Sequence, residues 1–257
     1  MQALVHLLIF FGALQAYFFG FLLVSNRNRK PYEWWLLLLL MSLGTMQILH
    51  FLRWEGYLEN YMPVFLRARF LFPALIGPAF YLFSRSIASK SITNKILIFS
   101  FLPAFINCIL LSPYLFQPSE VKIHYALHML YPVNYYLIYI IARLSLLTFS
   151  CLAFFTVVRN EQQLTWLKKM SAFLIIHSLI LIIINLIDFV FYEIVSYYYI
   201  NLINTLLIFL LGFFTIRYGR MYQGQENRRR QRDHYQKSGL SEATAGALLA
   251  RLDQMMT

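Results

Sequence analysis

The chain of 257 residues is both strongly apolar and strongly basic. Hydrophobic residues make up 60% of it and charged residues only 13%, whereas a soluble domain carries about 25% charged residues. This composition excludes an ordinary water-soluble domain and predicts a protein surrounded by lipid. The net charge of +11 comes from short basic runs between apolar segments, so it indicates membrane topology before it indicates nucleic-acid binding.

Seven apolar segments are each long enough for a helix to cross a hydrocarbon core of about 30 Å. None of them alternates with the period of two that a membrane β-strand shows, so we predict an all-α bundle of seven transmembrane helices. The first segment lacks the basic start and the cleavage site of a signal peptide, and we expect it to be retained. The predicted spans are residues 3–25, 32–52, 62–87, 95–112, 134–158, 169–190 and 197–218.

The charge of the links between these spans alternates along the chain. The odd-numbered links are basic and carry Arg27, Arg29, Lys30, Arg85, Lys90, Lys95, Arg159, Lys168 and Lys169. The even-numbered links are neutral or acidic and carry Arg53, Glu55, Glu59, Glu120, Lys122, Asp188 and Glu193. By the positive-inside rule, the odd links and the C-terminal tail lie in the cytoplasm and the N-terminus lies outside it.

Four prolines interrupt the third, fourth and fifth spans. Proline has no amide hydrogen and its ring clashes with the preceding turn, so each one is expected to bend or to start a helix. They are Pro73, Pro78, Pro103 and Pro132.

The composition changes after Tyr218, where the predicted transmembrane domain (1–218) ends and a cytoplasmic connector (219–257) begins. An amphipathic helical pattern starts near Ser241, a candidate N-cap, and stops in mid-pattern at Thr257. We therefore expect the coding sequence to continue into an output domain. The connector also contains a basic run, which we interpret as an anchor attracted to anionic lipid at about 1 kcal/mol per residue. The run comprises Arg228, Arg229, Arg230 and Arg232.

Polar residues inside the spans gather in the half that is expected to face outward. Ionisable groups are costly in hydrocarbon, so each that turns inward is a candidate site residue. At 100° per residue, Arg67 and Arg69 diverge by about 200°, so only one of them can face a cavity. We expect the other to reach the surface or to pair with Glu55 or Glu59. His177, Asn185 and Asp188, by contrast, fall within an arc of about 80°.

We hypothesise an outward-opening, water-lined pocket whose cationic excess favours a small anionic ligand. Its candidate residues are Arg67 or Arg69, Arg143, Asn185, Asp188, Asn201 and Asn204, with Gln47 and His50 at the edge. The alternative is structural: Arg143 and Asp188 form an ion pair, and the asparagines join helices through hydrogen bonds worth about 0.6 kcal/mol each.

Catalytic and metal-binding signatures are missing from the sequence. It has no HExxH, GxSxG or P-loop motif, so we expect no enzyme activity. Cys108 and Cys151 stand alone in apolar segments and are expected to be small core residues, not metal ligands. We expect no cofactor, because the seventh span also lacks the lysine that a retinal protein needs.

Two short segments carry a resemblance to a known family. The first is Tyr235-Gln-Lys-Ser-Gly-Leu-Ser, and the second is Leu75-Ile-Gly-Pro-Ala-Phe-Tyr-Leu-Phe, with Gly77, Pro78 and Tyr81. With the helix count, they make the chain similar to the N-terminal part of bacterial membrane-bound AraC-type transcriptional regulators. The resemblance implies a sensory domain in the inner membrane and a cytoplasmic DNA-binding domain with two helix-turn-helix units. That domain would begin beyond Thr257, so DNA would be a partner only through it.

Three further possibilities follow from the same features. DNA readers are usually two-fold symmetric, so a homodimer is expected, with the stretch from Ser241 as a candidate contact. The same bundle could instead serve a histidine kinase or a cyclase. It could also be a small transporter, although the sequence has no internal repeat.

Overall fold

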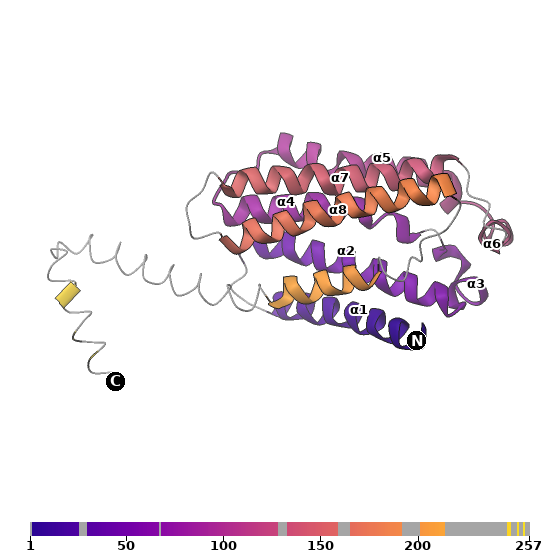
Figure 1. The fold of residues 1–257 in the computed structure, drawn as a ribbon, viewed down its shortest axis with the longest axis horizontal. Coiled ribbons are helices and arrows are strands. Elements are labelled where there is room, and N and C mark those ends of the chain that lie inside the picture. Colours follow the sequence, from indigo (N-terminus) through magenta and orange to yellow (C-terminus); the bar gives the residue numbers. More distant parts are fainter. Residues whose placement is uncertain are drawn as a thin grey trace. The chain divides into compact units, whose positions relative to one another are not determined.

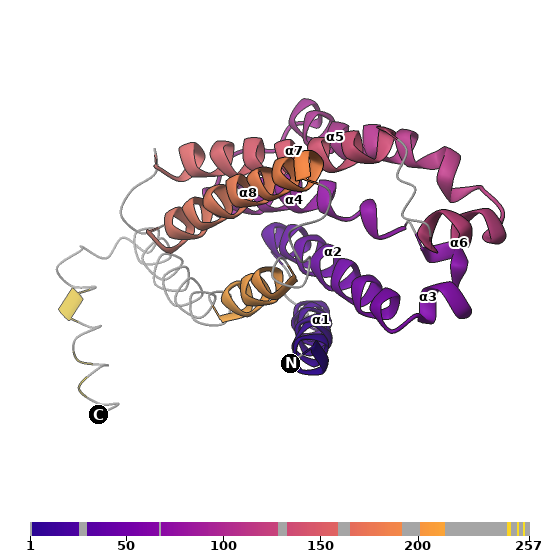
Figure 2. The same ribbon diagram turned by 45° about the vertical axis from the view of Figure 1, so that its right-hand side comes forward.

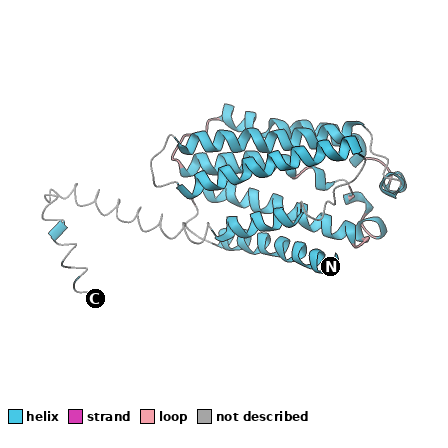
Figure 3. Cartoon of the chain, viewed as in Figure 1, coloured by secondary structure: helices cyan, strands magenta, loops and turns pink. Residues whose placement is uncertain are grey.

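The computed structural model describes residues 2–25, 30–66, 68–127, 133–158, 165–191 and 201–213, and also residues 246–247, 251 and 254. The chain divides into two compact units, Met1–Leu210 and Leu211–Thr257. The described part of the second unit is helical, and the basic run from Arg228 to Arg232 lies outside the described residues. Across the described ranges the regular elements are helices and no strand occurs (Figure 3), which confirms the predicted all-α class.

Five of the described helices are long and apolar enough to cross a membrane. Each coincides with a span predicted from the sequence, to within a few residues at either end. These helices are α1 (Gln2–Ser25), α2 (Pro31–Trp54), α5 (Asn94–Leu115), α7 (Val133–Val158) and α8 (Thr165–Phe191). The chain thus has the architecture of a multi-pass membrane protein.

The third predicted span is a bent pair and not one continuous helix over residues 62–87. Two short 3-10 turns, η1 (Pro63–Phe65) and η2 (Ala68–Phe70), precede α4 (Pro73–Ile87) at an angle of 45°. The break falls where Pro73 starts α4, because a proline in the first turn needs no amide partner but cannot extend a helix from before it. The prediction that Pro73 bends or starts a helix is therefore confirmed, and the predicted span 62–87 begins with two 3-10 turns and not with a regular helix.

The structure describes only part of the last predicted span and three of the four prolines named above. The seventh predicted span, 197–218, is described over a short apolar helix, Asn201–Phe213. Counting the bent pair as one span, up to six helices reach membrane length in the described chain. Pro78 and Pro103 lie within α4 and α5, and Pro132 lies outside the described residues.

In the first unit the helices run side by side (Figures 1 and 2). Helix α4 packs against both α2 and α7, while α1 packs on α2 and α8 packs on α7. The short helices α3 (Tyr57–Asn60) and α6 (Ser119–Leu127) both contact η1 at one end of this bundle. The start of α1 lies at the same end, since His6 Nδ1 is 2.7 Å from Glu55 Oε1. The N-terminus and the first two even links therefore share one end, as alternate crossings require.

Local caps fix the two ends of α5. Thr93 accepts the Ile96 amide at the start of the helix, and its backbone is extended, as in an ordinary N-cap. At the other end, Lys122 of α6 is 3% exposed and donates from Nζ to the Leu115 carbonyl at 2.7 Å. A cation beside the last carbonyls of a helix is favourable, because the helix dipole is negative there. This contact ties α6 to the bundle.

The closest approach of α4 to α7 depends on Gly77. A Cβ at this position would lie 2.8 Å from both Leu146 Cα and the Ser145 carbonyl oxygen, which are backbone atoms and cannot move aside. Ser145 Oγ also donates to the Ala74 carbonyl at 3.4 Å. Gly77 is therefore a packing residue, and this explains the glycine of the Gly-Pro-x-x-Tyr pattern in physical terms.

We expect Gly77→Ala to lower the free energy of unfolding by about 1–3 kcal/mol, because the added methyl forces the two helix backbones apart. Gly20→Ala on α1 is the matched control, since its Cβ would meet only flexible side-chain ends, Leu37 Cδ1 at 3.2 Å and Met41 Sδ at 3.3 Å. Thermal unfolding in detergent micelles measures both. Equal unfolding midpoints for the two variants would contradict the assigned α4–α7 contact.

Candidate functional site

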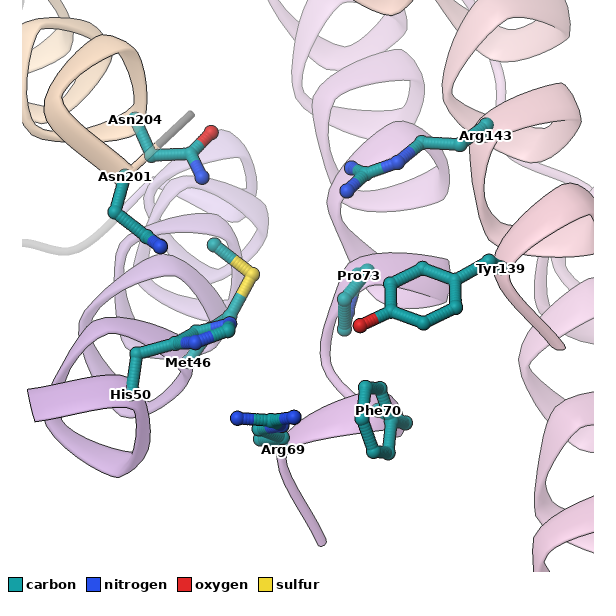
Figure 4. A pocket seen from close by; sticks show the side chains of 9 residues that line it. All are labelled: Met46, His50, Arg69, Phe70, Pro73, Tyr139, Arg143, Asn201 and Asn204. Atoms are coloured by element: carbon teal, nitrogen blue, oxygen red, sulfur yellow. The ribbon is translucent and has the colours of Figure 1, made fainter. Parts of the chain in front are cut away.

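Helices α2, α4, α7 and Asn201–Phe213, together with the η2 turn, surround a small cavity (Figure 4). Its volume is about 20 Å³, which is room for one or two waters. Five elements thus contribute to a single space inside the bundle. The lining residues are Met46, His50, Arg69, Phe70, Pro73, Tyr139, Arg143, Asn201 and Asn204.

Arg69 enters the cavity from the bend that precedes α4. The residue is only 5% exposed, and its guanidinium carbon lies 4.6 Å from the centre of the Phe70 ring. Its Nε is fully buried and has no hydrogen-bond partner in the described part of the chain. A buried donor left unpaired costs about 1–3 kcal/mol, and more when it is charged. Arg69 is therefore a group that a bound acceptor would stabilise.

Arg143 approaches the same cavity from α7. It is 7% exposed, and its guanidinium points across the space toward Asn204 (Figure 4). Arginine keeps its charge at any ordinary pH, so two permanent positive charges face one cavity in a region of low dielectric. No aspartate or glutamate is among the lining residues.

A buried hydrogen-bond network attaches Asn201–Phe213 to α2. Gln47 is fully buried and donates from Nε2 to the Asn201 carbonyl at 2.8 Å and to Thr205 Oγ1 at 3.0 Å. Thr205 in turn donates to the Asn201 carbonyl at 3.0 Å. A Cβ added to Gly12 of α1 would lie only 2.7 Å from the Thr205 side chain. Helix α1 therefore packs closely on the same helix. The helix that carries Asn201 and Asn204 is thus held against both α1 and α2.

The network extends to α8 through His177. His177 Nε2 lies 3.1 Å from Asn204 Oδ1, and both residues are buried. Asn204 therefore contacts the cavity and α8 at once. A displacement of Asn204 by a bound molecule would act directly on His177.

Five predicted site residues line the cavity, and the others fall into two groups. Gln47 lies behind the cavity as a hydrogen-bond partner, and Asn185 does not line it. Arg67, the side chain of Asp188 and the tail arginines lie outside the described residues, so an Arg143–Asp188 pair stays a prediction. The five that the structure brings together are His50, Arg69, Arg143, Asn201 and Asn204.

The predicted partners of the third-span arginines are engaged elsewhere. Glu55 contacts His6, and Glu59 lies 3.7 Å from Arg53. Arg69 lines the cavity from the η2 turn, as one of the two arginines was predicted to do.

The sequence analysis missed several residues of the cavity and of the hydrogen-bond network, although helical spacing indicates three of them. Met46 and Tyr139 each stand four positions before a predicted site residue, His50 and Arg143, and Thr205 stands four positions after Asn201. Residues four apart share a helix face, so extending each face by one turn would have found them. Phe70 and Pro73 carried no such signal, because the 3-10 turn that brings Phe70 to the cavity was not predicted.

Comparison of the chain with family models, with curated proteins and with solved structures finds no match. Within the described residues no group of three His, Cys, Asp or Glu side chains is placed to hold a metal ion. The chemistry of the site therefore has to be inferred from its own donors and charges.

A double-mutant cycle tests the contact between α8 and the cavity. For His177→Leu and Asn204→Leu we expect a coupling free energy of about 0.6 kcal/mol and at most about 1.7 kcal/mol, as for other hydrogen bonds between membrane helices. The control pairs His177→Leu with Asn107→Leu, since Asn107 donates to the Ile138 carbonyl at 3.2 Å and belongs to another contact. The control effects should add within about 0.5 kcal/mol. Purely additive effects in the first pair would contradict the network.

Proposed function

We propose that the chain is the sensory domain of a membrane-bound transcriptional regulator and not an enzyme. It has seven transmembrane helices in the bacterial inner membrane, with the N-terminus outside and the tail inside. A small anionic ligand enters the cavity from the outer side. Its binding changes the position of the seventh helix, which passes the signal through the connector to a cytoplasmic DNA-binding domain.

The observation that carries this proposal is that Asn201 and Asn204 line the cavity. They belong to the helix that precedes the connector in the sequence, and Gln47 and His177 hold this helix through three hydrogen bonds in the bundle core. A molecule in the cavity therefore contacts the described helix that precedes the tail in the sequence. A sensor needs this link between ligand and exit helix, because a ligand shifts an equilibrium only through contacts that differ between two states.

The distribution of charge supports the orientation. At the end of the bundle shared by α3 and α6, the carboxylates of Glu55, Glu59 and Glu120 accompany Arg53 and Lys122. The links at the opposite end carry Lys30, Arg85, Lys90, Lys95, Lys168 and Lys169. Because the cytoplasmic side of a membrane protein is enriched in Lys and Arg, the second end is assigned to the cell interior.

The output domain is inferred from the resemblance to AraC-type regulators. The complete coding sequence tests this inference first. Paired helix-turn-helix units would support it, whereas a histidine-kinase or cyclase domain would contradict a DNA-binding output. Regulators that read paired half-sites are dimers, so we also propose a homodimer joined through the stretch from Ser241. Cross-linking in native membranes that yields only monomers would contradict the dimer.

The function is tested by transcript profiling of strains that carry the complete gene with site substitutions. We expect Arg143→Gln and Asn204→Leu to alter the same transcripts as deletion of the gene, with unchanged abundance in the membrane. Arg143→Gln removes a positive charge that lines the cavity, and Asn204→Leu breaks the contact between the exit helix and His177. Arg53→Gln is the control, since it removes a positive charge from a pair at the end of the bundle. A deletion strain with a wild-type profile, or site variants that match Arg53→Gln, would refute the proposal.

A further inference from the structure

We infer that the outer link, residues 57–66 between α2 and α4, is a lipid-binding surface and not a loop in water. Its partner is the phospholipid of the outer leaflet, at the boundary between the headgroups and the acyl chains. The outer side of the membrane and the role of this surface in signalling rest on the proposed function. The depth of the outer link rests on its packing, on the length of α4 and on its exposed side chains.

The outer link folds back along α2 and does not leave the bundle. Leu58 of α3 and Leu66, which follows η1, are buried in one cluster with Leu49 of α2. Leu49 stands five residues before Trp54, where α2 ends, and this is about 7.5 Å along the helix axis. Helix α2 has 24 residues and spans about 36 Å, so it ends close to the edge of a hydrocarbon core of about 30 Å. The outer link therefore returns to the depth of that edge.

The length of α4 leads to the same depth. Helix α4 has 15 residues and spans only about 22 Å, so it is too short to cross the hydrocarbon core by itself. It reaches membrane length only together with the turns over Pro63–Phe70. These turns lie at 45° to α4, so they run partly along the membrane plane and not straight out of it. The end of the outer link therefore belongs to the membrane-embedded part of the chain.

The outward face of the outer link is apolar and aromatic. Five of its large hydrophobic side chains are between 45% and 75% exposed, whereas its acidic residue, Glu59, lies 3.7 Å from Arg53. A surface loop in water exposes mainly polar and charged side chains. Tyrosine, by contrast, is enriched where a membrane meets water, because its ring is apolar and its hydroxyl is polar. The five exposed residues are Tyr57, Tyr61, Met62, Val64 and Phe65.

Helix α6 provides the contrast at the same end of the bundle. It contacts η1, and its exposed residues include Glu120 and His124. Its Lys122 turns inward to the end of α5. Polar side chains therefore face outward on α6, whereas apolar ones face outward on the neighbouring outer link. We expect the boundary between lipid and water to pass between these two surfaces.

The outer link also connects lipid to the cavity. Phe65 ends η1, and the next turn, η2, contributes Arg69 and Phe70 to the cavity wall. A lipid or amphiphile that displaces η1 therefore acts on the cavity through a few residues of continuous chain. Such contacts shift the receptor only if they differ between its two states. The outer leaflet is thus a second partner of the proposed sensor, besides the ligand.

Electron paramagnetic resonance of nitroxide labels tests the depth of the outer link in the complete protein, in phosphatidylcholine liposomes. Phe65→Cys and Tyr61→Cys carry the label in a background without Cys108 and Cys151. The label on native Cys108, which is exposed on α5, is the lipid control, and Glu120→Cys on α6 is the water control. Oxygen concentrates in hydrocarbon, whereas a nickel chelate stays in water. We expect the ratio of oxygen to nickel collisions to be several-fold higher for Phe65→Cys than for Glu120→Cys, with Tyr61→Cys between them.

Two results would overturn the lipid-binding surface. Equal collision ratios for Phe65→Cys and Glu120→Cys would place the outer link in water. Exclusion of both oxygen and the nickel chelate from Phe65→Cys would show that protein covers the surface, from a second copy of the chain or from another partner. Val64→Cys repeats the measurement on the same exposed face if Phe65→Cys does not fold.

Transcript profiling separates the surface from its role in signalling. We expect Phe65→Gln in the complete gene to alter the transcripts that deletion of the gene alters, because it weakens the contact of η1 with lipid. Phe116→Gln is the matched control, since Phe116 is an exposed phenylalanine at the end of α5 that does not line the cavity. Equal profiles for the two variants, with Phe65→Cys in lipid, would contradict the signalling role and leave the surface intact. The collision ratios do not depend on which side faces outward, so a reversed topology would contradict the proposed orientation alone.

Discussion

Hydrocarbon offers no hydrogen bonds, so every polar group of a membrane helix must find its partner inside the protein. This constraint explains most of the interior of the bundle. Hydrogen bonds join three helices through Gln47, His177, Asn204 and Thr205. Lys122 donates to the last carbonyl of α5. Large apolar side chains remain exposed along α1 and α5, where lipid would cover them. Arg69 Nε is among the buried polar atoms that have no hydrogen-bond partner in the described residues.

The helix Asn201–Phe213 connects these features. Its polar residues contact the cavity, α2 and α8, and Thr205 lies against Gly12 of α1. A helix held by several individually weak hydrogen bonds can adopt a second position at modest cost, since each bond between membrane helices contributes only about 0.6 kcal/mol.

Much of the fold could be predicted from the sequence, because length and hydropathy alone define a membrane helix. The five long helices and the helix start at Pro73 follow from apolar length and from proline chemistry. The two 3-10 turns before α4 did not follow, since hydropathy does not distinguish a 3-10 turn from a regular helix. The cost of polar groups in hydrocarbon identified Arg143, Asn201 and Asn204 as candidates. It could not assign Arg69, whose direction depends on the 3-10 turn, nor the separation of Asn185 from the cavity, which depends on packing between helices.

Accessibility labelling with a membrane-impermeant maleimide tests the central claim, that the helices alternate across the membrane and the basic links face the cell interior. In a background without Cys108 and Cys151, single cysteines replace Glu120 in α6 and Lys90 after α4, both of which are exposed. Glu120→Cys should react on intact cells, and Lys90→Cys should react only after the membrane is permeabilised. Reaction of both on intact cells, or the reverse pattern, would contradict the topology and with it a cavity that receives its ligand from outside.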